Sequence, residues 1–245
     1  RCAQWAYDLS HAEWAPWPNY RGLRGATGTQ ASFLALFGGD QRRVDELELR
    51  FLFRVFNELD DPGLFADDRA QFEQDLDALR QGSEPEHGVV SSLRMYTCVL
   101  TTQTYPRIDD ACVLSSLAGV AAVLHKIATD IRLLSNRKEI DEPFEDKQIG
   151  SSAMPYKRNP MRCERICGLT RFVMNLVGNA YDTAATQWLE RTLDDSSNRR
   201  LSLPEAFLAL DGALDLMHNV ASGLIVHEAT VKKNLMAELP FMATE

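Results

Sequence analysis

The sequence predicts an all-α protein built as a bundle of long helices. Apolar residues recur at helical spacing over three long stretches that contain no cluster of turn-forming residues. Strands would show as an alternation of apolar and polar residues, and that pattern is nearly missing. Long helices joined by short connections, with hardly any strand pattern, are typical of a helical bundle.

The first predicted long helix runs over residues 109–136, where the apolar residues form a broad stripe. The second begins after Asn159 and Pro160, which have the form of a helix cap followed by proline at the first helical position, and continues to about Thr186. The third passes through residues 201–224, again with apolar residues at helical intervals. These three helices are the predicted bundle.

Two segments interrupt this order. Residues 11–21 contain two prolines where a helix would otherwise continue, and they predict a loop. Residues 48–92 carry eleven acidic side chains against four arginines, a net charge of −7 in a chain of net charge −9. Turn-forming sequences within this segment favour a partly disordered acidic insertion at the surface, with a short amphipathic helix from about Asp67 to Leu79.

The composition is that of an ordinary globular protein, with 45% apolar and 25% charged residues among 245. The acidic balance argues against a general binder of nucleic acid or of anionic membranes, which needs a basic surface. No apolar run approaches the roughly 20 residues that span a bilayer. The chain does not begin with methionine, and we expect it to be part of a longer protein.

The five cysteines are an odd number without the spacing of a disulfide framework, which favours a reducing compartment. Cys163 and Cys167 lie four residues apart, as two metal ligands on one helix face do. Because no matching pair of histidines lies nearby, we interpret these cysteines as structural residues rather than as a metal site.

The densest candidate site is residues 150–160, Gly-Ser-Ser-Ala-Met-Pro-Tyr-Lys-Arg-Asn-Pro, in a stretch from 147 to 200 with a net charge of +4. Its glycine, serines and prolines predict a loop, which ends at a helix N-terminus whose free N–H groups favour anions. Lys157, Arg158 and Asn159 add donors there. The loop fits a carboxylate whose charge grows in a transition state, with a serine as candidate base. A solvated linker that caps the helix is the alternative.

Two further stretches are each open to two interpretations. Residues 187–200 contain Arg191, Ser196 and Arg200, which match the oxygens of a phosphate if they converge. Capping of a helix by the neighbouring acidic residues, with the arginines facing solvent, is the alternative. Residues 24–30, Arg-Gly-Ala-Thr-Gly-Thr-Gln, form a glycine and threonine turn that is not a P-loop, because no Gly-Lys-Ser/Thr follows.

Taken together, these stretches resemble the adenylosuccinate lyase family of the fumarase/aspartase superfamily. Residues 150–160 look like the signature loop of the superfamily, and Ala153, Tyr156 and Arg158 are the variants that separate this family from fumarases and argininosuccinate lyases. Further support comes from residues 28–33, 188–200 and 239–245. The resemblance covers about residues 22–47 and 95–245.

The resemblance implies a nearly all-α, cytoplasmic homotetramer with composite active sites built from several subunits. It implies a non-hydrolytic β-elimination of fumarate from adenylosuccinate, giving AMP, and from SAICAR, giving AICAR, in purine biosynthesis. It implies no metal, no organic cofactor, no nucleic acid and no membrane.

Carried over by position, the resemblance gives four residues a part in the elimination. Ser151 would be the general base that removes the proton from the succinyl β-carbon, and because a hydroxyl is a poor base, nearby cations must lower its pKa. Lys157 and Asn159 would stabilise the aci-carboxylate as its negative charge accumulates. Glu164 matches the carboxylate that orients the general-acid histidine of the family.

Five more residues match substrate-binding positions of the family. Gln30 and Arg165 match contacts to the substrate, and Arg191, Ser196 and Arg200 match contacts to its phosphate.

The sequence also departs from the family. The general-acid histidine belongs to an N-terminal region absent here, so we expect this chain alone to be inactive. We expect residues 1–239 to form the central bundle domain, with the acidic insertion at about 48–92, and residues 240–245 to begin a C-terminal domain. Pro204 falls inside a family helix, where we expect a kink or a restart capped by Ser202.

Two other functions stay open at this point. One is another lyase of the superfamily, such as argininosuccinate lyase, whose substrate carries no phosphate to match the second stretch. The other is a non-catalytic helical module that uses the bundle for oligomerisation alone, which would explain the missing general acid.

Overall fold

The computed structural model describes residues 2–12, 20–57, 68–85, 87–98, 100–144, 154, 158–189 and 191–239. These residues confirm the predicted all-α class, with two very short strands besides the helices. They form two compact units. The first unit comprises Arg1–Pro16, Ala111–Tyr181 and Ser196–Glu245, and the second comprises Trp17–Asp110 and Asp182–Asp195.

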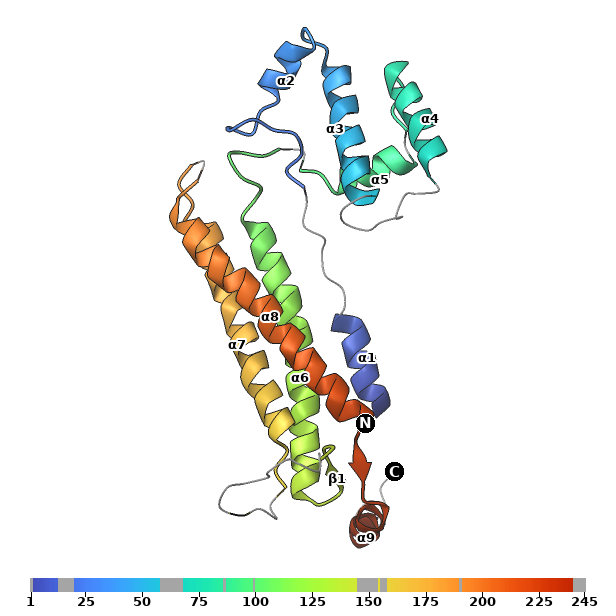
Figure 1. The fold of residues 1–245 in the computed structure, drawn as a ribbon, viewed down its shortest axis with the longest axis vertical. Helices are drawn as coiled ribbons and strands as arrows, with labels where there is room; N and C mark the ends of the chain where they lie inside the picture. Colours follow the sequence, from blue (N-terminus) through green and yellow to red (C-terminus); the bar gives the residue numbers. More distant parts are fainter. Residues whose placement is uncertain are drawn as a thin grey trace. The chain divides into compact units, whose positions relative to one another are not determined.

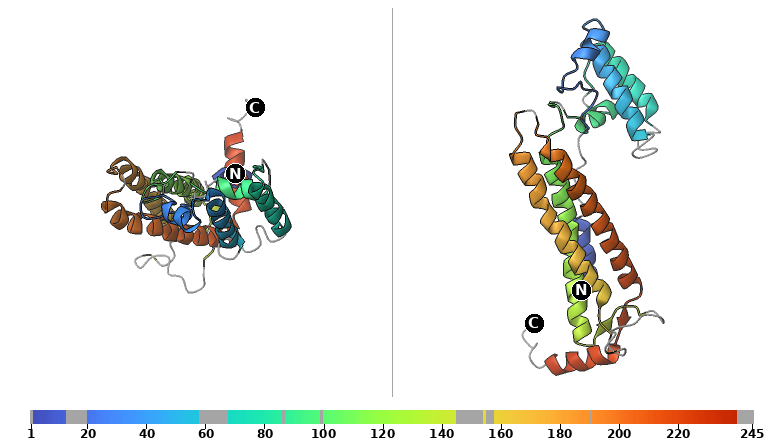
Figure 2. Two further views of the ribbon diagram at one scale, coloured as in Figure 1. Left: turned by 90° about the horizontal axis from the view of Figure 1, so that it is seen from above. Right: turned by 60° about the vertical axis from the view of Figure 1, so that its left-hand side comes forward.

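The first unit is a bundle around three long helices that run side by side (Figures 1 and 2). Its elements are α1 (Cys2–Ala12), α6 (Ile108–Asn136), β1 (Ile140–Asp141), α7 (Met161–Ala185), α8 (Asp194–Ser222), β2 (Ile225–Val226) and α9 (Glu228–Glu238). A continuous apolar core joins α1, α6, α7 and α8. The predicted long helices are thus confirmed as α6, α7 and α8.

Helix α6 lies in this core with seven buried apolar residues. They are Ala111, Leu114, Ala121, Leu124, Ile127, Ala128 and Ile131. With a mean hydropathy of 1.7 over its most apolar window, α6 is the one helix in the described ranges that is long and apolar enough to cross a membrane. The expectation that no stretch has this property is therefore wrong. A helix in the core of a bundle needs the same apolar composition.

The first turn of α7 is capped by Glu142, a residue from the preceding connection. The Glu142 carboxylate accepts hydrogen bonds from the backbone N–H groups of Arg162 (3.1 Å) and Cys163 (2.7 Å), and it is buried. The side chain of Asn159, the predicted cap, is not needed, because the other first-turn N–H groups donate to backbone carbonyls. A sequence-distant carboxylate therefore takes the place of the local cap.

Helix α8 continues through Pro204. The hydroxyl of Ser202 donates to Asn198 in the same helix, so the expected restart with Ser202 as cap is wrong. Proline removes one backbone hydrogen bond from the ladder, but the buried residues Ala206, Leu210 and Ala213 on the next turns hold the helix against the core.

The short strands close one end of the first unit. Strand β1 pairs antiparallel with β2, with Ile140 opposite Val226. His227 follows β2, and its Nε2 lies 2.8 Å from the Asp141 carboxylate. The backbone N–H of His227 also donates to the Glu139 carbonyl, which fixes the start of α9 beside β1.

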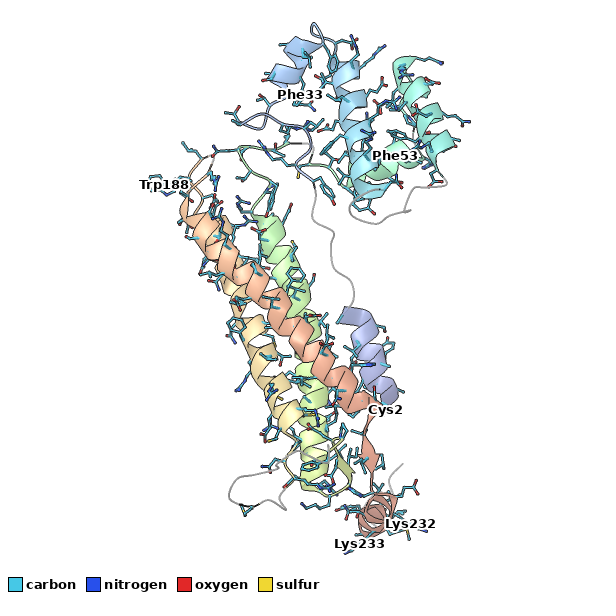
Figure 3. The ribbon with its side chains drawn as sticks, viewed as in Figure 1. Cys2, Phe33, Phe53, Trp188, Lys232 and Lys233 are labelled. Atoms are coloured by element: carbon cyan, nitrogen blue, oxygen red, sulfur yellow. The ribbon has the colours of Figure 1, made fainter. Side chains whose placement is uncertain are left out.

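The second unit contains α2 (Ala31–Leu36), α3 (Gln41–Val55), α4 (Arg69–Arg80) and α5 (Val89–Met95). Helices α3, α4 and α5 share a separate apolar core. The rings of Phe53 and Phe72 stack at its centre with centroids 4.2 Å apart, and Figure 3 labels Phe53. Arg50 adds an ion pair to Glu46 on its own helix and another to Glu73 on α4.

The prediction of a partly disordered surface insertion at residues 48–92 is therefore wrong for the described part of this segment. Most of the buried residues of the second core belong to it. Helix α4 confirms the short amphipathic helix predicted there. Within the predicted loop at 11–21, Ala12 belongs to α1, and residues 13–19 lie outside the described residues. Residues 240–245, the predicted start of another domain, also lie outside them.

The bundle core makes a first prediction. Replacing Leu124, which is fully buried in α6, by Ala should lower the free energy of unfolding by about 2–5 kcal/mol, because it removes apolar contacts and leaves a cavity. Leu133→Ala on the same helix is the control, since Leu133 is 60% exposed and its loss should cost less than about 0.5 kcal/mol. Urea unfolding measures both, and equal losses would contradict the position of α6 in the core.

The cap of α7 makes a second prediction. Glu142→Ala should lower the free energy of unfolding by about 1–3 kcal/mol, because two N–H groups lose their acceptor in a buried place. Asn159→Ala should change it by less than about 0.5 kcal/mol, because no first-turn N–H depends on its side chain. A larger loss for Asn159→Ala than for Glu142→Ala would show that the local cap is the stronger one.

Candidate active site

Two of the predicted catalytic residues line one surface cavity in the first unit. The cavity has a volume of about 720 Å³ and lies between the C-terminal end of α6 and the start of α7. Asn159 and Glu164 line it from the α7 side. Charged groups on the other side include Arg132, Lys138 and Asp141. Ser151 and Lys157, the other two predicted catalytic residues, lie outside the described residues.

The cavity is lined by both cationic and acidic side chains. The cations suit an anionic ligand, and the acidic groups suit proton transfer to or from that ligand. Arg158 also lines it and lies 4.8 Å from the centre of the Phe144 ring, so its guanidinium is placed by a cation–π contact. Asn159 adds a neutral donor beside that cation.

The predicted anion site at the N-terminus of α7 needs a correction. Glu142 already accepts the N–H groups of Arg162 and Cys163, so these donors are not available to a substrate carboxylate. A negative side chain at this position also satisfies the positive end of the helix dipole. Side chains rather than the helix terminus must therefore supply any anion contacts in this cavity.

Arg165 lies on α7 directly after Glu164 and is exposed. Successive residues on a helix point about 100° apart, so the two side chains leave α7 in different directions. Arg165 is not among the residues that line the cavity of Asn159 and Glu164.

The second predicted stretch surrounds the connection between α7 and α8. Arg191 precedes α8, and its Nε and Nη2 donate to one carboxylate oxygen of Asp195 at 3.3 and 3.2 Å. Ser196 and Arg200 lie one turn apart on α8. In the same connection Trp188 is 78% exposed, and Figure 3 shows it at the end of the two helices. Arg191 is bound to a carboxylate, so the alternative of arginines that simply face solvent does not hold for it.

The third stretch forms a tight turn in the second unit. Gly28 has a φ of 81°, and a Cβ there would lie 2.3 Å from the Thr101 carbonyl oxygen, so only glycine fits. Gln30 lines a cavity of about 350 Å³ in this unit together with Arg24 and Glu48. The Gln30 Nε2 donates to Glu48 at 3.2 Å, so the amide is oriented by that carboxylate.

Sequence reasoning missed the buried partners of these residues. Arg107 donates its Nε to Asp195 over a separation of 88 residues, and Glu142 caps a helix that begins 19 residues later in the chain. Local spacing carries no signal for such pairs.

No cluster of three or more His, Cys, Asp or Glu side chains in the described ranges is suited to hold a metal ion. At Cys163, burial and then a hydrogen bond to Glu142 raise the pKa of the thiol far above its usual range. The thiol therefore stays protonated, and a protonated thiol is neither a nucleophile nor a good metal ligand.

Comparison with known proteins gives a consistent result. Residues 86–175 match the model of a family described as Lyase. The chain is 50% identical to an adenylosuccinate lyase of Schizosaccharomyces pombe over 226 residues, which is 92% of this chain and 39% of that protein. It is 46% identical to the adenylosuccinate lyase of Saccharomyces cerevisiae over 227 residues, again 92% of this chain and 39% of the relative.

Among solved structures, the chain resembles a 3-carboxy-cis,cis-muconate lactonizing enzyme from Pseudomonas putida. The TM-score is 0.49 at 23% identity, and the match covers 77% of this chain and 43% of the other. The chain spans about two fifths of the length of the two adenylosuccinate lyases named above. These identities show that the chain is homologous to adenylosuccinate lyases, and residues 86–175 belong to the family described as Lyase.

Proposed function

We propose that the protein carrying this chain is an adenylosuccinate lyase. It would release fumarate from adenylosuccinate, giving AMP, and from SAICAR, giving AICAR. The observation that carries the proposal is the charged cavity lined by Asn159 and Glu164, which are two of the four residues matched to catalytic positions of the family. The identity to adenylosuccinate lyases over 92% of the chain supports the same activity.

In the proposed reaction, Ser151 takes a proton from the succinyl β-carbon. The electrons left on that carbon form the double bond of fumarate as the carbon–nitrogen bond breaks, and a general acid protonates the leaving nitrogen. No water is consumed. Lys157 and Asn159 stabilise the charge that develops on the neighbouring carboxylate. Glu164 orients the histidine that acts as general acid.

The proposal gives five further residues contacts to the substrate. Gln30 and Arg165 bind the substrate, and Arg191, Ser196 and Arg200 bind its phosphate. Guanidinium groups and a hydroxyl match phosphate oxygens in geometry and charge. These phosphate contacts also favour this reaction over that of argininosuccinate lyase, because argininosuccinate has no phosphate.

We further propose that the protein is a cytoplasmic homotetramer with composite active sites. Helix α8 supports this, because it exposes large apolar side chains along its length. They are Leu201, Phe207, Leu208 and Leu214. Apolar side chains exposed in a row mark an interface between proteins more often than a free surface. In the described ranges the five cysteines are free, which agrees with a reducing compartment.

The base assignment is tested on a protein of the relatives' full length that contains this chain. Ser151→Ala should lower kcat for fumarate release by about 10²–10⁴-fold while substrate still binds, because the proton acceptor is lost. Ser152→Ala is the matched control and should keep most of the activity. Fumarate absorbance measures turnover. Full activity in Ser151→Ala, or loss only in Ser152→Ala, would overturn the assignment. No turnover by the parent protein would favour the non-catalytic module.

The phosphate assignment is tested by Arg200→Ala in the same protein. The KM for adenylosuccinate should rise about 10- to 100-fold, which corresponds to the roughly 1.5–3 kcal/mol of a hydrogen bond to a charged group. Arg137→Ala is the control, because Arg137 is an exposed arginine that pairs only with Glu139 among the described residues and should leave KM unchanged. An unchanged KM in Arg200→Ala would contradict the phosphate contact and favour another lyase of the superfamily.

A further inference from the structure

The carboxylate of Asp195 is buried between two guanidinium groups. One oxygen accepts from Nε and Nη2 of Arg107 at 2.8 and 2.7 Å. The other accepts from Nε and Nη2 of Arg191 at 3.3 and 3.2 Å. The side chain of Asp195 is 0% exposed, that of Arg107 is 7% exposed and that of Arg191 is 24% exposed. All three residues belong to the second unit.

A helix cap does not explain this arrangement. Asp195 lies in the first turn of α8, where a negative charge is favourable to the helix dipole whether or not it is paired. Capping would use a carboxylate oxygen on the backbone of α8 and would not need a cation from a segment 88 residues away. Each oxygen accepts from a different arginine, so the carboxylate also holds two guanidinium groups in place.

The two arginines differ in exposure, which separates their parts. Arg107 is almost fully buried, and its guanidinium lies 4.7 Å from the centre of the Tyr105 ring, so it is an internal support. Its Nη1 is buried without a hydrogen-bond partner in the part of the chain that the structure describes. Arg191, with 24% of its side chain exposed, is the member of the trio that reaches solvent.

An arginine held at two of its nitrogens has a fixed plane, so it loses less conformational freedom when it binds a phosphate. Nε and Nη2 of Arg191 both donate to one oxygen of Asp195, so this constraint applies to its guanidinium. The geometry of the trio therefore prepares Arg191 to bind an anion.

We propose that Asp195, itself held by Arg107, is a positioning residue that fixes the guanidinium of Arg191 for the phosphate of the substrate. This inference rests on the proposed function, since it takes Arg191 as a phosphate contact. Asp195 does not touch the substrate. Its effect is confined to ligands that carry the phosphate.

The test compares AMP with adenosine on the full-length protein that contains this chain. Asp195→Asn keeps the shape of the side chain but replaces one charged acceptor by a donor. The Kd for AMP, measured by titration calorimetry, should rise about tenfold, and the Kd for adenosine should change less than twofold. Asp194→Asn is the matched control, because it removes the same charge from the exposed neighbouring residue and should change neither Kd.

The outcomes separate the inference from the proposed function. A parent protein that neither binds AMP nor releases fumarate would overturn both. A parent protein that does both, with Asp195→Asn binding AMP as tightly as the parent, would overturn only the role of Asp195. An equal loss for AMP and adenosine would show a general structural role and would also overturn it.

A second variant covers the case in which Asp195→Asn does not fold. Arg107→Lys keeps the buried positive charge but cannot present two nitrogens in a fork to Asp195. It should show the same selective loss, with AMP weakened several-fold and adenosine unchanged. A loss of equal size for both ligands, or none for AMP, would contradict the support of Arg191 through Asp195.

Discussion

The close packing of α6, α7 and α8 is the constraint on which the rest of the structure depends. Alanines line this contact at full burial, among them Ala121, Ala128, Ala206 and Ala213. Small side chains let long helices approach closely, so the register of each helix against the next is strongly fixed. That register decides how the ends of the three helices lie relative to one another. The residues matched to the active site lie mostly at these ends, as Glu164 does in the first turn of α7.

The sequence was sufficient to predict the long helices but not the contacts between their ends. Periodicity depends on residues a few positions apart, and α6 accordingly begins one residue from its predicted start. Glu142 and Arg107 act on residues far along the chain, and no local pattern records which partner the fold brings to them. The residue types of the signature loop were enough to recognise it. The prediction that the N-terminus of α7 binds an anion was wrong, because Glu142 already accepts the N–H groups there.

The prediction that the acidic segment at residues 48–92 is a partly disordered surface insertion was wrong for a related reason. Its charge and turn residues indicated exposure, and charge is indeed exposed on α3 and α4, where Arg80 pairs with Glu46 and lowers the pKa of that carboxyl. Phenylalanine and leucine at helical spacing lie on the opposite faces of the same helices and form a core. Net charge describes one face of an amphipathic helix and leaves the other undetermined. Composition averaged over a segment therefore hides the pattern that decides its structure.

Three carboxylates share one structural task in this chain. Glu142 holds the start of α7, Asp195 holds the arginine before α8, and Glu48 holds the glycine and threonine turn through Arg24 and Gln30. Each carboxylate accepts hydrogen bonds from groups on another segment. A neutral amide side chain is less suited to this, because only its oxygen accepts and its nitrogen donates. The guanidinium groups of Arg24 and Arg191 are thus each paired with a carboxylate inside the fold.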